Sequence, residues 1–204
     1  MKWYRQVQFV AAVAMPPEEE EAFGTTVNGM WADPERRTAD DVADAHEAGR
    51  RVLFSVPMIA LTPNVYEDPP TAYLLDEVCG DIGGAPSECD WYYWESKPVY
   101  AACIYSQAFR DYLLDRCRLG VDRGMDVVNL DEIMTSIGLM DREPGGCGFC
   151  SRCLDRFRTH APDAALPEGD DEARAALAAD DDLYARYRRF QEEEAYREMV
   201  GFIG

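Results

Sequence analysis

The sequence predicts an α/β protein in which parallel strands alternate with helices. An apolar run at residues 98–104 indicates a buried strand, a helical pattern follows at 107–119, and a second apolar run follows at 125–130. Strand, helix and strand within about 35 residues form a βαβ crossover, which makes the two strands parallel. Strand patterns at 6–13 and 51–56 extend the alternation towards the N-terminus.

The first half of the chain has its own boundary signals. At the start of the stretch 6–13, Gln6 and Gln8 alternate with Val7 and Phe9, which is typical of a strand. Thr38 is placed to cap a helix at 39–48, and Gly49 stands where such a helix ends. The apolar run at 51–56 is the second strand.

The second half continues the pattern after a long excursion at 57–96, which contains a short helix at 71–78. Ser106 is a plausible N-cap for the helix at 107–119, and Gly120 and Gly124 lie where that helix would end. Beyond the strand at 125–130, a helix is expected to run through Phe157.

The C-terminal part is expected to be a polar linker at 162–170 and then helical sequence at 171–200. Four βα units are half of a closed (β/α)8 TIM barrel, which needs eight units in about 250 residues. We therefore expect one domain over 1–204, a partial barrel with a helical C-terminal segment at 162–204. A small open parallel sheet is the alternative. A half-barrel would be truncated and would expose strand edges, so we expect a homodimer or a missing C-terminal half.

The composition excludes some partners. A net charge of −19 argues against nucleic acid and anionic membranes, since both require clustered basic residues. No apolar stretch approaches the length of a membrane span. Seven cysteines, an odd number with three at tight spacing, are more typical of an intracellular metal site than of a disulfide framework. We expect a cytoplasmic protein.

Two carboxylates follow the strand at 125–130. Asp131 and Glu132 stand at its carboxyl end, where parallel α/β folds place their active sites. Adjacent residues of a strand point to opposite faces, so the two cannot easily act as a pair, and one needs a distant partner. The structural alternative is that Asp131 caps the loop and Glu132 pairs with an arginine.

Three cysteines follow at close spacing: Cys147, Cys150 and Cys153. Such spacing can supply metal ligands from one turn, and zinc favours four in a tetrahedron. An iron–sulfur cluster is a second interpretation, although the nearby fourth cysteine and proline of the familiar motif are absent. Free thiols are the third. The cysteines expected to be ordinary core or loop residues are Cys79, Cys89 and Cys117.

Three stretches of the chain resemble a known family. They are Cys103-Ile-Tyr-Ser-Gln-Ala-Phe-Arg-Asp-Tyr, Val128-Asn-Leu-Asp-Glu132 and Phe149-Cys-Ser-Arg-Cys-Leu-Asp-Arg-Phe-Arg158. Together they resemble the glycoside hydrolase family 42 β-galactosidases and related glycosyl hydrolases with a (β/α)8 barrel. The resemblance is clearest over residues 97–158 and extends to 5–96 only in the order of strands and helices.

The resemblance implies roles for single residues. Glu132 falls where the family has its general acid/base. Asp131 is a rival, because the family usually has Asn at that position. The nucleophile of the family comes from the seventh strand, which this chain lacks. Cys103 would join the later cysteines to hold a structural zinc. The family's run is usually C-x-C-x-x-C, whereas Cys147 stands one residue further back.

With Cys103, the three clustered cysteines make four ligands, and His160 is a fallback fourth ligand. The function expected is a glycoside hydrolase-like protein that acts on or binds carbohydrate, and the alternative is a non-catalytic, zinc-stabilised carbohydrate-binding or assembly domain. Aromatic rings present flat faces to sugars, although for any single ring core packing is the slightly favoured alternative. The expected substrate-binding residues are Trp31, Trp91, Tyr92, Tyr93, Trp94 and Asn129.

Overall fold

The fold of this chain is mixed α/β, as predicted. The computed structural model describes residues 9–11, 25–29, 38–49, 51–57, 60–61, 72–88, 99–131, 146–195, 197–198 and 201. These residues fall into two compact units, one within Met1–Val56 and Tyr112–Asp131, the other within Pro57–Asp111 and Glu132–Gly204. The boundary falls within helix α4 (Gln107–Asp122).

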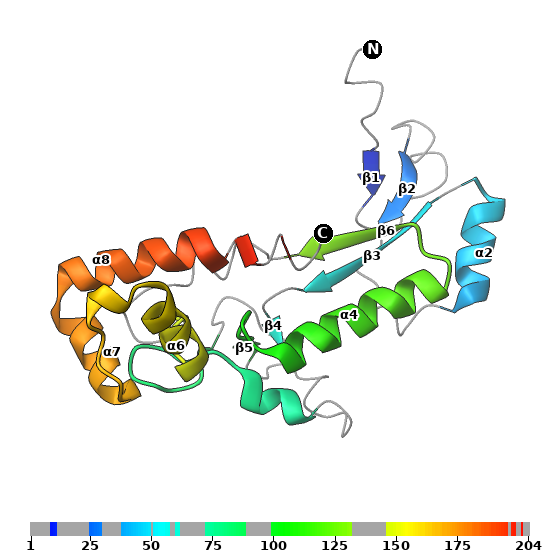
Figure 1. The fold of residues 1–204 in the computed structure, drawn as a ribbon. Coiled ribbons are helices and arrows are strands. Elements are labelled where there is room, and N and C mark those ends of the chain that lie inside the picture. Colours follow the sequence, from blue (N-terminus) through cyan, green and yellow to red (C-terminus); the bar gives the residue numbers. More distant parts are fainter. Residues whose placement is uncertain are drawn as a thin grey trace, which may run out of the picture. The chain divides into compact units, whose positions relative to one another are not determined.

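The first unit is built on a four-stranded sheet with the order β1-β2-β3-β6 (Figure 1). β1 pairs with β2 and β2 with β3 in parallel, and the arrows of β3 and β6 point the same way in Figure 1. Three of the four predicted strands, those at 6–13, 51–56 and 125–130, therefore have counterparts in this sheet. The strand β2 was not predicted, because its sequence TTVNG has no apolar run. The bounds are β1 Phe9–Ala11, β2 Thr25–Gly29, β3 Arg51–Pro57 and β6 Val127–Asp131.

Helix α2 (Ala39–Glu47) begins where the sequence places it. The Asp41 backbone N–H donates to Thr38 Oγ1 over 3.2 Å, and the Thr38 backbone N–H donates to Asp41 Oδ2 over 2.8 Å. This reciprocal pair is a capping box, which satisfies two backbone donors that would otherwise be orphaned. Val42 is the buried residue of the helix.

Helix α4 runs past Gly120, the first of the two glycines expected at its end, and stops just before the second, Gly124. Gly120 lies inside the helix because it faces Phe54, and a Cβ at this position would come within 2.3 Å of the Phe54 ring. The turn occurs at Gly124, whose φ of 84° favours glycine. The main buried side chains of this unit are Val42, Val52, Phe54, Val56, Leu113 and Met125.

The predicted strand at 98–104 is not part of the parallel sheet, so the predicted crossover from it to β6 is wrong. Only β5 (Tyr100–Ala101) is a strand, and it pairs antiparallel with β4 (Ala60–Leu61) in a separate two-stranded sheet. The physical reason is that the backbone around β5 is hydrogen-bonded to residues 77–88. The partial barrel and the open sheet both remain predictions.

The second unit has a helical core (Figure 1). The region predicted to be one helical stretch at 171–200 contains two helices, which separate at Asp180, the N-cap of the second. The expected linker at 162–170 contains a 3₁₀ turn and buries Leu166. Phe157 and Tyr187 pack edge to face with ring centroids 4.9 Å apart. The elements are η3 Ala72–Glu77, α6 Ser151–His160, η4 Pro162–Ala164, α7 Asp170–Ala179, α8 Asp181–Phe190 and a π-helical turn, η5 Gln191–Ala195.

None of the helices in the described part of the chain is both long and apolar enough to cross a lipid bilayer.

Candidate metal centre

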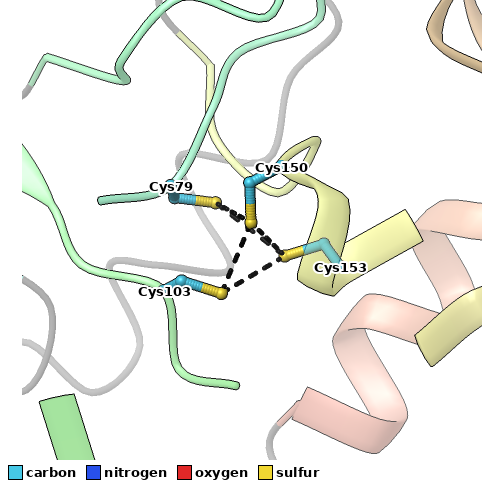
Figure 2. A group of neighbouring side chains, drawn as sticks. All are labelled: Cys79, Cys103, Cys150 and Cys153. Atoms are coloured by element: carbon cyan, nitrogen blue, oxygen red, sulfur yellow. Dashed lines mark hydrogen bonds between the residues drawn. The ribbon is translucent and has the colours of Figure 1, made fainter. Parts of the chain in front are cut away.

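Four cysteine side chains converge in the second unit: Cys79, Cys103, Cys150 and Cys153 (Figure 2). Cys150 Sγ lies 3.5 Å from Cys103 Sγ and 3.5 Å from Cys153 Sγ, and the sulfurs of Cys103 and Cys153 are 3.7 Å apart. Cys79 Sγ is 3.9 Å from the sulfurs of Cys150 and Cys153. Disulfide sulfurs are about 2.05 Å apart, so these are free thiols.

These distances match the edges of a tetrahedron around one metal ion. Zn–S bonds of about 2.3 Å give sulfur–sulfur edges of about 3.8 Å, and the five distances above run from 3.5 to 3.9 Å. A cluster of several iron atoms would hold the thiolates further apart. Four sulfur donors with tetrahedral spacing are typical of zinc or iron. The residues therefore fit a single tetrahedral ion.

The first two ligands are placed by backbone hydrogen bonds between two segments far apart in sequence. The Cys79 N–H donates to the Ala101 carbonyl over 2.7 Å, and the Cys103 N–H donates to the Glu77 carbonyl over 3.0 Å. The Ala101 N–H donates to the Ser87 carbonyl over 2.9 Å. These bonds hold the two segments in antiparallel contact and bring Cys79 beside Cys103.

The other two ligands lie at the start of helix α6. Cys150 is the N-cap residue, with an extended backbone (φ −70°, ψ 163°), and its carbonyl accepts from the Leu154 N–H over 3.1 Å. Cys153 lies three residues on, within the first turn of the helix. Residues three apart on a helix share a face, so the C-x-x-C spacing turns both sulfurs to the same point.

The fourth cysteine of the group is Cys79, and the turn before α6 contacts it. Gly148 has a φ of 103°, which favours glycine, and its N–H donates to Cys79 Sγ over 3.0 Å. Cys147, the predicted ligand, is buried but is not among the four grouped sulfurs. Cys79, which was expected to be an ordinary loop residue, takes that place. The spacing of the cysteines carried no signal for Cys79, which lies far from the C-x-x-C pair in sequence.

The cluster makes Cys150 its most acidic thiol. Hydrogen bonds from the thiols of Cys103, Cys153 and Cys79 hold the pKa of Cys150 well below its ordinary value and outweigh the opposing effect of burial. The hydrogen bond to Cys150 raises the pKa of Cys103, and burial raises it further. A lowered pKa favours the thiolate of Cys150, and the thiolate is the form of cysteine that binds metals.

Charged and polar groups surround the cluster. Arg152 Nη1 lies 3.1 Å from Glu77 Oε2. The pKa of Arg152 is raised. Partial burial acts to lower this pKa, but a hydrogen bond to Cys103 and the negative charges of Cys103 and Cys150 outweigh the effect of burial. On the other side, the buried hydroxyl of Tyr187 donates to the Gly148 carbonyl. The turn at Gly148, which leads into Cys150, is therefore held by a hydrogen bond from the core of the helical unit.

The other predicted site residues are not brought into this centre. Asp131 is the last residue of β6, as expected, and Asn129 lies on the same strand with an exposed side chain. His160, the fallback ligand, packs against the Phe190 ring with centroids 4.9 Å apart. The predicted residues that lie outside the described part of the chain are Trp31, Cys89, Trp91, Tyr92, Tyr93, Trp94 and Glu132.

No protein-family model matches the chain, and no curated protein sequence matches it significantly. Among solved structures, the chain is similar to Aspergillus fumigatus Ega3 in complex with galactosamine, with 16% identity, a TM-score of 0.44 and coverage of 74% of this chain and 49% of that one. It is also similar to TtGalA, an α-galactosidase from Thermus thermophilus, in complex with stachyose, with 20% identity, a TM-score of 0.43 and coverage of 71% of this chain and 33% of that one. The chain thus spans half or less of the length of each. TM-scores below 0.5 do not establish a shared fold.

Proposed function

We propose that the four grouped cysteines hold one zinc ion, that its role is structural, and that the protein it stabilises acts on carbohydrate. The observation that carries the metal site is the spacing of the four sulfurs: five of the six distances between them are 3.5 to 3.9 Å, and all six are within 4.8 Å. A zinc ion with four protein ligands has no open position for water or substrate, which is the pattern of structural rather than catalytic sites.

The stabilising role follows from where the ligands come from. Cys79 and Cys103 belong to two segments joined by backbone hydrogen bonds, and Cys150 and Cys153 begin helix α6. One ion would therefore tie three segments of the second unit together. Such binding contributes directly to the free energy of folding, because the unfolded chain offers no preformed site.

The ligand set is tested by cobalt substitution, since Co²⁺ bound to thiolates absorbs strongly and reports the number of sulfur ligands. We expect Cys79→Ser to weaken this absorption and lower the melting temperature. Cys147→Ser is the matched control, a buried cysteine outside the group, and should keep the four-thiolate spectrum. Loss of the spectrum in Cys147→Ser, with retention in Cys79→Ser, would contradict the assignment.

The carbohydrate proposal rests on the carboxylates. β6 ends at Asp131, so Glu132 follows directly at the carboxyl end of a strand in a parallel sheet. This is the edge at which parallel α/β folds place catalytic groups. The sequence around Glu132 and the cysteines resembles family 42 glycosidases, and we propose Glu132 as general acid/base with Asp131 as its rival. A glycosidase also needs a second carboxyl group across the scissile bond.

The test measures hydrolysis of aryl α- and β-galactosides by the protein together with any downstream segment. We expect Glu132→Gln to abolish hydrolysis while galactose binding is retained, and Asp122→Asn, an exposed carboxylate at the end of α4, to have no effect. Unchanged hydrolysis in Glu132→Gln, with loss in Asp131→Asn, would move the role to Asp131. Sugar binding without hydrolysis in the unaltered protein would favour the non-catalytic binding domain.

A further inference from the structure

A second candidate site lies in the helical unit, beside α6. It is a pocket of about 380 Å³ whose lining includes three arginines, Arg110, Arg152 and Arg156, together with Tyr105 and Glu198. Its volume is near the lower end of the range for small-molecule sites, which suits a ligand of monosaccharide size. The metal ligands do not line it.

The lining of this pocket has more basic than acidic residues, unlike the chain as a whole, although its arginines pair with Glu198 and with Glu77, which is not in the lining. The whole chain carries a net charge of −19, yet three arginines line this pocket against two carboxylates, Asp155 and Glu198. Asp155 is also engaged by Arg158, at 2.5 Å. Cations clustered in a cleft attract anions more strongly than the same charges spread over a surface.

The geometry around Glu198 shows which chemical group the arginines of the pocket already bind. Arg110 Nη2 lies 2.7 Å from Glu198 Oε2, and Arg156 Nη2 is paired with Glu198 Oε1, so one carboxylate bridges two guanidiniums. Arg110 is held in place by its Nε–H, which donates to the Ile104 carbonyl over 2.7 Å. Arg156 stacks over Tyr105 with 5.5 Å from guanidinium carbon to ring centroid. Planar guanidinium forks of this kind match carboxylates.

We propose that this pocket binds a small molecule through a carboxylate group, and that Glu198 is an internal carboxylate that competes for the same arginines. Arg156 is the residue best placed to receive the ligand, because nearly half of its side chain (48%) is exposed, whereas only 17% of Arg110 is. Our choice of a sugar acid as the first probe rests on the proposed carbohydrate function. The inference that the ligand is an anion rests on the arginines of the pocket and not on that function.

The experiment is calorimetric titration of the whole protein with D-glucuronate, with D-glucose as its neutral counterpart and malonate as a carboxylate that is not a sugar. We expect saturable binding of glucuronate and none of glucose. Arg156→Gln should bind about tenfold more weakly or worse, since a hydrogen bond to a charged group is lost. Glu198→Gln should bind about tenfold more tightly, because the internal competitor is gone.

Arg118→Gln is the control, an exposed arginine paired with Asp115 on α4. Each variant is first checked for an unchanged circular dichroism spectrum. If Arg156→Gln fails to fold, Arg156→Lys replaces it, because lysine keeps the charge but not the planar fork. Binding of malonate without glucuronate would uphold the anion site and count against the carbohydrate proposal alone. Absence of saturable binding of both anions in the unaltered protein and in Glu198→Gln would overturn the inference, as would equal binding of glucose.

Discussion

Arg152 is the residue that links the metal centre to its surroundings. The guanidinium of Arg152 pairs with the Glu77 carboxylate, and the Glu77 carbonyl accepts from the Cys103 N–H. The Nε of Arg152 has no acceptor in the part of the chain that the structure describes. The nearby sulfurs of Cys103 and Cys150 raise its pKa. A zinc ion with four thiolates carries a net charge of −2, so a cation at this place stabilises the loaded site.

We expect Arg152→Gln to weaken zinc affinity by about tenfold or more, the usual cost of losing a partner of a metal ligand. The measurement is competition with a chromophoric chelator at fixed pH. Arg152→Lys keeps the charge and should recover part of the loss, and Arg118→Gln should match the unaltered protein. Equal affinity in Arg152→Gln and the unaltered protein would show that Arg152 contributes nothing to the site.

Asp126 is expected to make the stability of the fold depend on pH. Its carboxylate lies 2.8 Å from His46 Nε2 and accepts from the Val52 N–H over 2.9 Å. Partial burial raises the pKa of Asp126, but the hydrogen bonds from Val52 and His46 outweigh burial and lower it. Because the folded pKa is lowered, this group stabilises the fold above its unfolded pKa of about 3.9. That stability is lost as the pH falls through the folded pKa.

Asp126→Asn should therefore be less stable than the unaltered protein at pH 6, and the two should converge below about pH 4. Urea unfolding across this pH range measures the difference. Asp122→Asn serves as the control. Two curves that stay parallel from pH 6 to pH 3 would contradict the role of Asp126.

Helix α4 illustrates how packing overrides a local signal. Glycine at position 120 suggests a helix end, but the structure uses it inside the helix to admit the Phe54 ring. Alanine is favoured over glycine in a helix by about 1 kcal/mol. A Cβ 2.3 Å from the Phe54 ring would force a repacking that costs about 1–3 kcal/mol, so we expect the packing cost to win.

Gly120→Ala should therefore lower the free energy of unfolding, as measured by urea denaturation. Val121→Ala, at a neighbouring position where the side chain is 62% exposed, is the control and should change stability little. A Gly120→Ala variant more stable than the unaltered protein would mean that the ring moves aside at low cost.

At the scale of elements, the sequence predicted those with strong local signals. The capping box at Thr38 and the apolar run of β3 place α2 and β3 within one or two residues. The strand β2 is polar and leaves no such signal. β5 was predicted in the wrong sheet because an apolar run indicates a strand but not its partner.

At the scale of the whole molecule, three of the four grouped cysteines could be predicted from spacing and resemblance. The fourth could not, because Cys79 reaches the site through a tertiary ladder and a positive φ at Gly148, neither of which is visible in the spacing of cysteines. The carboxylate assignments stay predictions, since Glu132 lies outside the described part of the chain and only the backbone of Asp131 is described.

One zinc ion that ties the second unit together should be visible in the mass of the native protein. The measurement is native mass spectrometry of the purified chain, before and after treatment with a chelator. We predict one zinc per chain, and a large fall in melting temperature when the chelator removes it. A metal-free protein whose melting temperature is indifferent to both chelator and added zinc would contradict the account.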